Sequence, residues 1–286
     1  MKFGINTFLW TAEFKEDNFH LLPVIRSHGF DGVEVSLFRP AGFPAAKIRR
    51  ALADERLECT VCSVLPRGVS LISEDRNVRG EAVSHLKACI ESTAEAGARI
   101  IAGPLYAPVG YLPGRRRTAD EWQAAVEGYQ QLGDVLSRLD VQLCIEPLNR
   151  FETFFLNTTA DAVRLCQEVN HPNVGILWDS FHANIEEKDP PAALQQAGPH
   201  LKHVHTCEND RGTPGSGHVD WRSLFVVLKN LNYSGWLTIE SFGFALGDLS
   251  SAASIWRDLE QNCEDIAWRG IEFLKRAAAV QADGAA

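Results

Sequence analysis

The sequence VQLCIEPLNRFETFFLNTTADAVRLCQEVNHPNVGILWDSFH, residues 141–182, contains one strand–helix–strand unit. Its two ends, 141–148 and 174–182, are short runs of apolar, β-branched and aromatic residues, which are typical of buried strands. Between them, residues 159–169 place apolar side chains three and four positions apart, as in a helix that packs one face on a core. This order of elements predicts a parallel βαβ unit.

The same alternation extends over the whole chain. Eight strand-like runs are found, at 3–8, 32–37, 58–65, 99–106, 141–148, 174–182, 201–208 and 236–242. Helical patterns fill the gaps and follow the last run, at 19–27, 45–56, 81–96, 120–139, 159–169, 191–197, 220–231 and 251–278. Eight units without a linker favour a closed barrel over a doubly wound open sheet, which usually has fewer strands. We therefore expect a single α/β domain, a (β/α)₈ TIM barrel over residues 1–286, with a frayed tail from about 279 to 286.

Composition limits the class of partner. The chain has 28 Lys and Arg against 37 Asp and Glu, and its formal net charge is −9. This charge opposes binding to a phosphate backbone, so we expect no nucleic-acid partner. No segment approaches the roughly 20 apolar residues of a membrane helix, and the start MKFGINTFLW lacks the pattern of a secretory signal. We expect a cytoplasmic protein with no membrane partner.

The seven cysteines fit a reduced interior. Their number is odd, and several lie inside strand-like runs, where a free thiol behaves as a small hydrophobic group. Cys59 and Cys62 form a CxxC pattern, but no second pair completes a zinc site. We expect these two residues to pack in the core.

Polar residues stand at the ends of four consecutive predicted strands. CIEPL contains Glu146, ILWDS contains Asp179, HVHTC contains His205 and TIESF contains Glu240. In (β/α)₈ enzymes the functional residues lie at the carboxyl ends of the strands, so these four are expected to meet at one rim. Each of them alone is most simply explained as part of a buried ion pair or hydrogen-bonded network.

Together the four residues predict a metal site. Three carboxylates in a low-dielectric environment repel one another strongly unless they are protonated or bound to a cation. One divalent ion on Glu146, Asp179, His205 and Glu240 removes this conflict. Three oxygen donors and one nitrogen suit hard cations, so we expect Mn²⁺ first, then Co²⁺, then Mg²⁺.

Four strings carry a family resemblance: CIEPLNRFE (144–152), WDSFH (178–182), HTCENDRG (205–212) and GWLTIES (235–241). They resemble the ketose 3-epimerases, the group of D-tagatose, D-psicose (allulose) and L-ribulose 3-epimerases in the xylose-isomerase-like TIM-barrel superfamily. The ligands themselves are shared across that superfamily. The combination of EPLNRFE with HxxExxRG is more specific to the epimerases.

The resemblance implies a metal-dependent isomerase that inverts C3 of free ketoses. The substrate pairs are L-ribulose/L-xylulose, D-psicose/D-fructose and D-tagatose/D-sorbose, and the reaction passes through a cis-enediolate by deprotonation and reprotonation. It makes Glu146, Asp179, His205 and Glu240 the metal ligands, with Glu146 and Glu240 also the acid/base pair. It makes Glu152, His182 and Arg211 the residues that hydrogen-bond the O1 and O2 end of the ketose. We expect a homodimer or homotetramer, and the sequence does not distinguish the two.

Simpler explanations exist for the three substrate-binding residues. Glu152 could pair with Arg150, His182 could cap a loop, and Arg211 could be a solvated loop cation. A fourth residue bears on specificity. Asn6 stands where relatives that act on hexuloses often carry an aromatic residue, and this predicts a preference for a pentulose such as L-ribulose.

Other functions remain open. A hydroxypyruvate isomerase-like or inosose dehydratase-like enzyme would share the barrel and the ligands. A DNA-repair endonuclease of the superfamily needs further histidine ligands and a basic face, which this acidic chain does not clearly show. A non-catalytic sugar-binding barrel is disfavoured by the pair of glutamates. The cluster Arg115–Arg117 could contact a substrate phosphate, although a charge run in a long loop is usually solvated.

Overall fold

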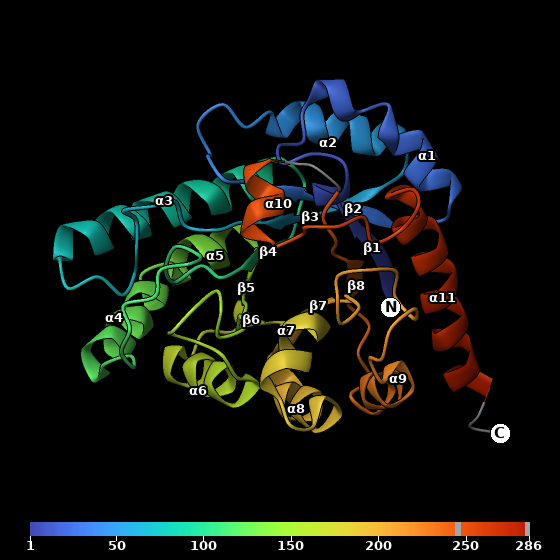
Figure 1. The fold of residues 1–286 in the computed structure, drawn as a ribbon. Coiled ribbons are helices and arrows are strands. Elements are labelled where there is room, and N and C mark those ends of the chain that lie inside the picture. The colour runs from blue at the N-terminus through green and yellow to red at the C-terminus, as the bar shows by residue number, and fades with distance from the viewer. Residues whose placement is uncertain (244–246, 284–286) are drawn as a thin grey trace.

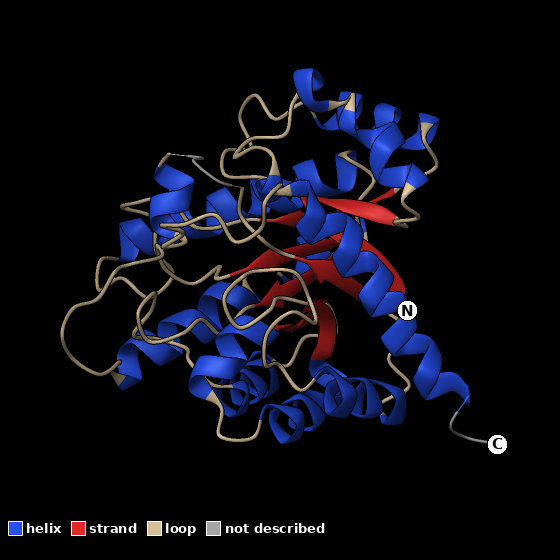
Figure 2. Ribbon diagram, turned by 45° about the vertical axis from the view of Figure 1, so that its right-hand side comes forward, coloured by secondary structure: helices blue, strands red, loops and turns tan. Residues whose placement is uncertain are grey.

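The computed structural model, which describes residues 1–243 and 247–283, has eight parallel strands closed into a barrel inside a ring of helices (Figures 1 and 2). The strands are β1 (Lys2–Asn6), β2 (Gly32–Ser36), β3 (Glu58–Cys62), β4 (Ile100–Gly103), β5 (Gln142–Ile145), β6 (Val174–Asp179), β7 (Leu201–His205) and β8 (Trp236–Ile239). Each strand pairs with the next, and β1 pairs with β8, which closes the sheet. The predicted (β/α)₈ TIM barrel is confirmed.

The helices lie outside the strands. They are α1 (Leu21–Ser27), α2 (Ala45–Asp54), α3 (Arg76–Glu95), α4 (Ala119–Gln130), α5 (Gly133–Leu139), α6 (Thr159–Val169), α7 (Ser180–Glu186), α8 (Pro190–Ala197), α9 (Trp221–Asn230), α10 (Asp248–Ala252) and α11 (Glu264–Asp283). Three short 3₁₀ turns occur at Thr7–Leu9, Glu16–Asn18 and Gly198–His200. No helix within the described ranges is long and apolar enough to cross a bilayer.

Several predicted boundaries are wrong, each for a local reason. The strand expected at 174–182 ends at Asp179, because this side chain accepts a hydrogen bond from the Phe181 amide and so caps α7. The helix expected at 120–139 is divided into α4 and α5. The helix expected at 251–278 is also divided, because Ser254 has φ of +56°, which an α-helix cannot contain.

Two other expectations concern the interior and the tail. The cysteines within the described residues are all free, and all but Cys263 are buried. The expected packing role of Cys59 and Cys62 agrees with this burial. Helix α11 continues to Asp283, so residues 279–283 of the expected frayed tail are helical, and 284–286 lie outside the described residues.

The strands have two different faces. Outward side chains such as Val33, Val61 and Ile239 belong to one large apolar core packed against the helices. Part of the interior is filled by a smaller apolar cluster of Ile100, Ala102, Cys144, Leu177 and Trp236. Gly32 leaves room for this tryptophan, since a Cβ there would lie 2.6 Å from the Trp236 ring. The rest of the interior near the carboxyl ends is polar, and this is the end of the barrel at which (β/α)₈ enzymes carry their functional residues.

Candidate active site

Four side chains converge at the carboxyl ends of β5 to β8. Glu146 follows β5, Asp179 ends β6, His205 ends β7, and Glu240 follows β8. All four are buried, and one ligand atom from each lies within 4.8 Å of the others. The structure therefore brings together the four residues that the sequence predicts as a metal site.

His205 is oriented as a metal ligand would be. Its Nε2 lies 2.7 Å from Glu34 Oε1, and its Nδ1 lies 3.4 Å from Glu240 Oε2 and 3.8 Å from Asp179 Oδ2. Nδ1 is buried and makes no hydrogen bond to any described residue. Metal-ligating histidines usually donate their other N–H to a carboxylate or carbonyl. A cation among the carboxylates would satisfy this nitrogen, so the residues fit a metal ion.

Arg211 already supplies one positive charge to the cluster. Its Nη1 donates to Asp179 Oδ2 at 2.7 Å and to Glu240 Oε2 at 2.8 Å, and its guanidinium lies 4.1 Å from the centroid of the Phe181 ring. The residue is 4% exposed and has φ of +66°. Ser241 holds its backbone by donating to the Arg211 carbonyl. The simpler explanation of Arg211 as a solvated cation is wrong.

The loop that carries Arg211 is organised around a buried carboxylate. Glu208 is fully buried and accepts hydrogen bonds from the amides of Asn209, Gly215 and Val219 and from the indole N–H of Trp221. These bonds shape residues 209–219. Glu208, the glutamate of the HxxExxRG pattern, therefore has a structural role in this loop that was not predicted from the sequence.

His182 and Glu152 meet at Asn149. The Asn149 amide donates to His182 Nδ1 at 3.1 Å, and its side-chain Nδ2 donates to Glu152 Oε1 at 2.8 Å. Arg211 Nη2, which can only donate, lies 3.2 Å from His182 Nε2, so both ring nitrogens of His182 face donors. Burial lowers the pKa of His182 to about 3, so the ring is neutral. Glu152 does not pair with Arg150, because Arg150 binds Glu186 at 2.9 Å instead.

The carboxyl groups of the cluster have different proton affinities. Burial and the neighbouring Glu240 raise the pKa of Glu146 well above its usual value. Burial alone would also raise the pKa of Asp179, but Arg211 and His205 lower it below its usual value. Burial raises the pKa of Glu152. Protonation of Glu146 would limit the negative charge of the cluster when no further cation is bound.

His205 responds to the same imbalance. Burial would lower its pKa, but the carboxylates of Glu34 and Glu240 raise it well above its usual value. A metal ion at Nδ1 would take the place of the second ring proton, since ligands lose their protons when they bind metal.

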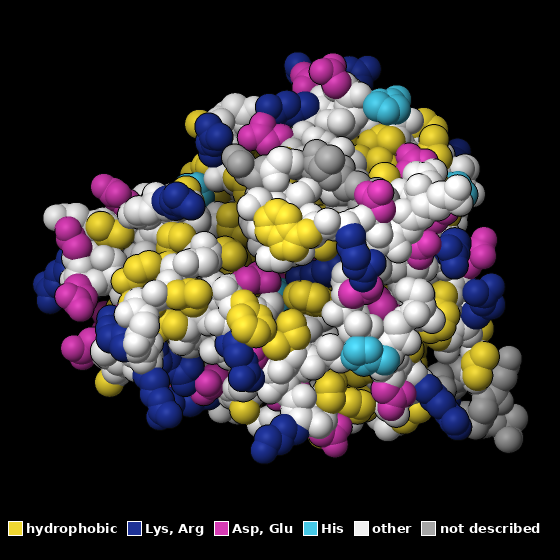
Figure 3. Space-filling view, in the orientation of Figure 1, with side chains coloured by type: hydrophobic (Ala, Val, Ile, Leu, Met, Phe, Trp, Pro, Cys, Tyr) yellow, Lys and Arg dark blue, Asp and Glu magenta, His cyan; other side chains and the backbone are white. Residues whose placement is uncertain are grey.

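A cavity of about 450 Å³ opens over the cluster. Glu146, Glu152, His182, Arg211 and Glu240 all line it. On the same face of the molecule, hydrophobic side chains gather around a hollow in which charged side chains are visible (Figure 3). The two proposed acid/base residues and the three proposed substrate-binding residues thus share one cavity.

One wall of this cavity is apolar, and it was not predicted from the sequence. Phe8 stacks between Phe38, with ring centroids 5.7 Å apart, and Phe242, with ring centroids 5.4 Å apart. All three rings line the cavity, together with Leu249 and Ala253. No common pattern marks these residues, because they come from distant parts of the chain.

Asn6 is not part of that wall. It is fully buried, its Nδ2 donates to Glu34 Oε1 at 2.9 Å, and its Oδ1 accepts from the Phe8 amide at 2.9 Å. The prediction that Asn6 leaves the cavity without an aromatic wall is wrong, because Asn6 does not line the cavity and Phe8, two residues later, does. The pentulose preference drawn from Asn6 loses its basis.

Comparisons with known proteins agree with this geometry. The model of the xylose isomerase-like TIM barrel family matches residues 22–277. The chain is 36% identical to a "probable ketose 3-epimerase" of Synechocystis sp., over 96% of each protein. It is 32% identical to a D-psicose 3-epimerase of Agrobacterium fabrum, over 91% of each. Its structure is similar to that of a D-allulose 3-epimerase from Methylomonas sp. in complex with D-allulose, with a TM-score of 0.91, 27% identity and 97% of each chain covered.

Proposed function

Because the chain belongs to the xylose isomerase-like TIM barrel family and within it to the ketose 3-epimerases, we propose that it inverts C3 of free ketoses with one divalent metal ion. The ligands are Glu146, Asp179, His205 and Glu240. The candidate pairs are L-ribulose/L-xylulose, D-psicose/D-fructose and D-tagatose/D-sorbose, and Mn²⁺ is the first candidate metal, before Co²⁺ and Mg²⁺. The proposed enzyme is cytoplasmic and works as a homodimer or homotetramer.

One observation carries the proposal: two glutamates from separate strands line the same cavity. Glu146 follows β5 and Glu240 follows β8, with β6 and β7 between them. Inversion of a carbon centre through a planar intermediate requires proton access from both faces, and two separate carboxylates can supply it. A single base would return the proton to the face that it left.

In this proposal the metal ion supplies Lewis-acid chemistry, and the protein side chains transfer the protons. A bound divalent cation supplies a Lewis acid that polarises the C2 carbonyl and so makes the C3 proton more acidic. One glutamate then removes that proton to give the cis-enediolate, and the other protonates C3 on the opposite face. In the reverse direction the two exchange roles. The hydrogen bond from Arg211 supports Glu240 as a carboxylate base.

Three further residues hold the substrate in this proposal. The neutral His182 lines the cavity beside Arg211, and Arg211 adds a positive charge where negative charge develops on O2. Glu152, held by Asn149, accepts from a hydroxyl at the O1 and O2 end. The apolar wall of Phe8, Phe38 and Phe242 faces the rest of the cavity and offers few hydrogen bonds, which supports activity on several ketoses.

The test is a panel of pentuloses and hexuloses, incubated with Mn²⁺-loaded protein and followed by chromatography. We expect interconversion of C3 epimers. A protein that changes none of these sugars, or that yields C4 epimers or aldoses, contradicts the proposal.

In deuterium oxide, product formed early should carry deuterium at C3, while recovered substrate carries much less. Equal early labelling of both would point to one base or to fast proton exchange between the two.

A further inference from the structure

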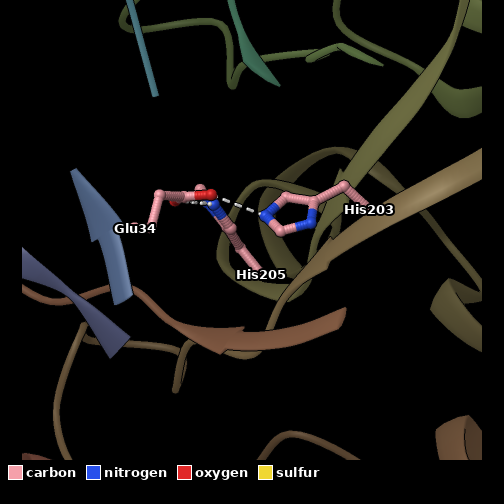
Figure 4. Close-up of side chains that lie close together, drawn as sticks. All are labelled: Glu34, His203 and His205. Atoms are coloured by element: carbon pink, nitrogen blue, oxygen red, sulfur yellow. Dashed lines mark hydrogen bonds and ion pairs between the residues drawn. The ribbon is translucent and has the colours of Figure 1, made fainter. Parts of the chain in front are cut away.

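A buried carboxylate lies next to the four-residue cluster, in the interior of the barrel. Glu34 on β2 is fully buried, and its side chain crosses the interior to reach His203 and His205 on β7 (Figure 4). Strands β8 and β1 separate β2 from β7 in the sheet. This contact therefore joins opposite parts of the barrel.

Both oxygens of Glu34 are fully used. Oε1 lies 2.7 Å from His205 Nε2 and 2.9 Å from Asn6 Nδ2. Oε2 lies 2.7 Å from His203 Nε2 and 3.0 Å from Thr60 Oγ1. A carboxylate has about four acceptor sites, so these contacts saturate it.

Stability alone does not explain this arrangement. Barrel interiors are usually filled by branched apolar side chains. A buried charge costs free energy that its hydrogen bonds only offset, and well-packed apolar residues often stabilise a protein as well or better. We therefore expect the Glu34 carboxylate to act on His205, which is both a hydrogen-bond partner of Glu34 and a member of the four-residue cluster.

That histidine has two nitrogens with different surroundings. A neutral imidazole carries one N–H, and Glu34 accepts it from Nε2 of His205. The lone pair then lies on Nδ1, which faces Asp179 and Glu240 and has no hydrogen-bond partner among the described residues. A proton on Nδ1 instead would remove the only nitrogen ligand of the cluster.

We propose that Glu34 is a positioning residue, which fixes the tautomer and the ring orientation of His205 so that Nδ1 is presented to the metal. Asn6, Thr60 and His203 hold Glu34 in place for this role. The inference rests on the proposed metal site and extends it to a residue that touches neither metal nor substrate. It also gives Asn6 a role, as one of the donors that hold Glu34.

Glu34→Gln tests the inference with little change of shape. The amide has one oxygen and one NH₂ group, so one of the two histidines must face a donor. The Asn6 Nδ2 donor beside Oε1 favours the amide oxygen on the His205 side. A neutral oxygen there holds the Nε2 proton and the ring less firmly than a carboxylate does, and it makes Nδ1 a less basic ligand. We expect the affinity for Mn²⁺, measured by calorimetry on the metal-free protein, to fall about 10–100-fold, as for other residues that orient metal ligands. Glu34→Asp, which keeps the charge but is too short to reach His205, should lower the affinity as well.

Thr60→Val is the matched control. It removes one donor to Oε2 in the same buried layer but leaves both contacts of Oε1 intact. We expect its melting temperature to fall while its affinity for Mn²⁺ stays close to that of wild type. The inference is overturned if Glu34→Gln and Glu34→Asp bind Mn²⁺ as wild type does. It is also overturned if Thr60→Val loses as much affinity as they do at an equal loss of melting temperature.

The wild-type titration separates this inference from the proposed function. A wild-type protein that binds no Mn²⁺, Co²⁺ or Mg²⁺ would overturn the metal site and the role of Glu34 together. A wild-type protein that binds Mn²⁺ with unchanged affinity in the Glu34 variants would overturn the role of Glu34 alone. If Glu34→Gln does not fold, Glu34→Asp and Thr60→Val still give the comparison.

Discussion

Two regions of this chain concentrate charge of one sign, and their charges are matched to different degrees. In the basic run Arg115–Arg117, Arg115 donates to both oxygens of Glu121, at 2.8 and 3.0 Å, Arg117 pairs with Asp161 at 2.8 Å, and Arg116 is exposed. In the acidic cluster of the barrel mouth, Asp179 and Glu240 share the Arg211 guanidinium, and Glu146 lies 3.6 Å from His182. A run of like charges in the sequence therefore does not by itself indicate a functional site. Buried charges with too few oppositely charged partners in the structure do indicate one.

The surroundings of the basic run lead to the same conclusion. Arg117 also donates to the Phe155 carbonyl at 2.6 Å and lies 4.6 Å from the centroid of the Trp122 ring. A cavity of about 490 Å³ lies beside Arg115 and Glu121, but these two charges pair with each other. Neither Arg115 nor Arg117 is free for the phosphate contact considered from sequence.

The largest expected difference between the two regions is in turnover. Glu146→Gln and Glu240→Gln each keep an oxygen for the metal but remove a carboxylate base, so kcat should fall by about 10²–10⁴-fold. Elemental analysis should find a smaller fall in metal content. Arg115→Gln, the control from the basic run, should leave kcat unchanged. Near-wild-type turnover in either glutamine variant would remove that glutamate from the mechanism.

Metal removal tests whether a cation balances the negative charge of the acidic cluster. Exhaustive chelation should abolish activity, and Mn²⁺ or Co²⁺ should restore it. Mn²⁺ at 100 times its dissociation constant should stabilise the fold by about 2.7 kcal/mol, because it binds the native state only. Thermal unfolding with and without Mn²⁺ measures this, and Asp179→Asn, which weakens the site, should respond less. Full activity in protein that elemental analysis shows to be free of metal would contradict the metal site.

The same substitution in both regions sharpens the comparison. Arg211→Lys keeps a positive charge but cannot bridge Asp179 and Glu240 while lying over the Phe181 ring. Hydrogen bonds between charged groups are worth about 1.5–3 kcal/mol, so kcat/KM should fall about 10–100-fold. Arg117→Lys should leave kcat/KM unchanged. Equal losses in the two variants would mean that the basic run contributes to catalysis after all.

The strands and the four ligands could be predicted because their signals are local. A short run of apolar, β-branched and aromatic residues marks each strand, and a charged residue at a strand end is visible in a few letters. Glu34 carried a similar signal, since it stands at an inward position of GVEVS on β2, but its partners His203 and His205 lie 169 and 171 residues away. The Asn149 contacts to His182 and Glu152 depend on how a loop folds, which no short pattern states. The contacts of Asn6 to Glu34 and to the Phe8 amide are likewise not visible in a short pattern.

The smallest expected effect comes from the basic run and concerns pH. Burial would raise the pKa of Glu121, but hydrogen bonds from Arg115 and the Thr118 amide lower it below 4.5. A carboxyl group with a lowered folded-state pKa contributes stability above the unfolded-state value, and this contribution disappears as the pH falls through the folded-state value. Arg115→Gln should therefore lower the free energy of unfolding only slightly at pH 7, because solvent screens the exposed Arg115 side chain. Urea unfolding of both proteins should show this difference shrinking below pH 4.5. A difference that grows on acidification would mean that Arg115 acts through some partner other than the Glu121 carboxylate.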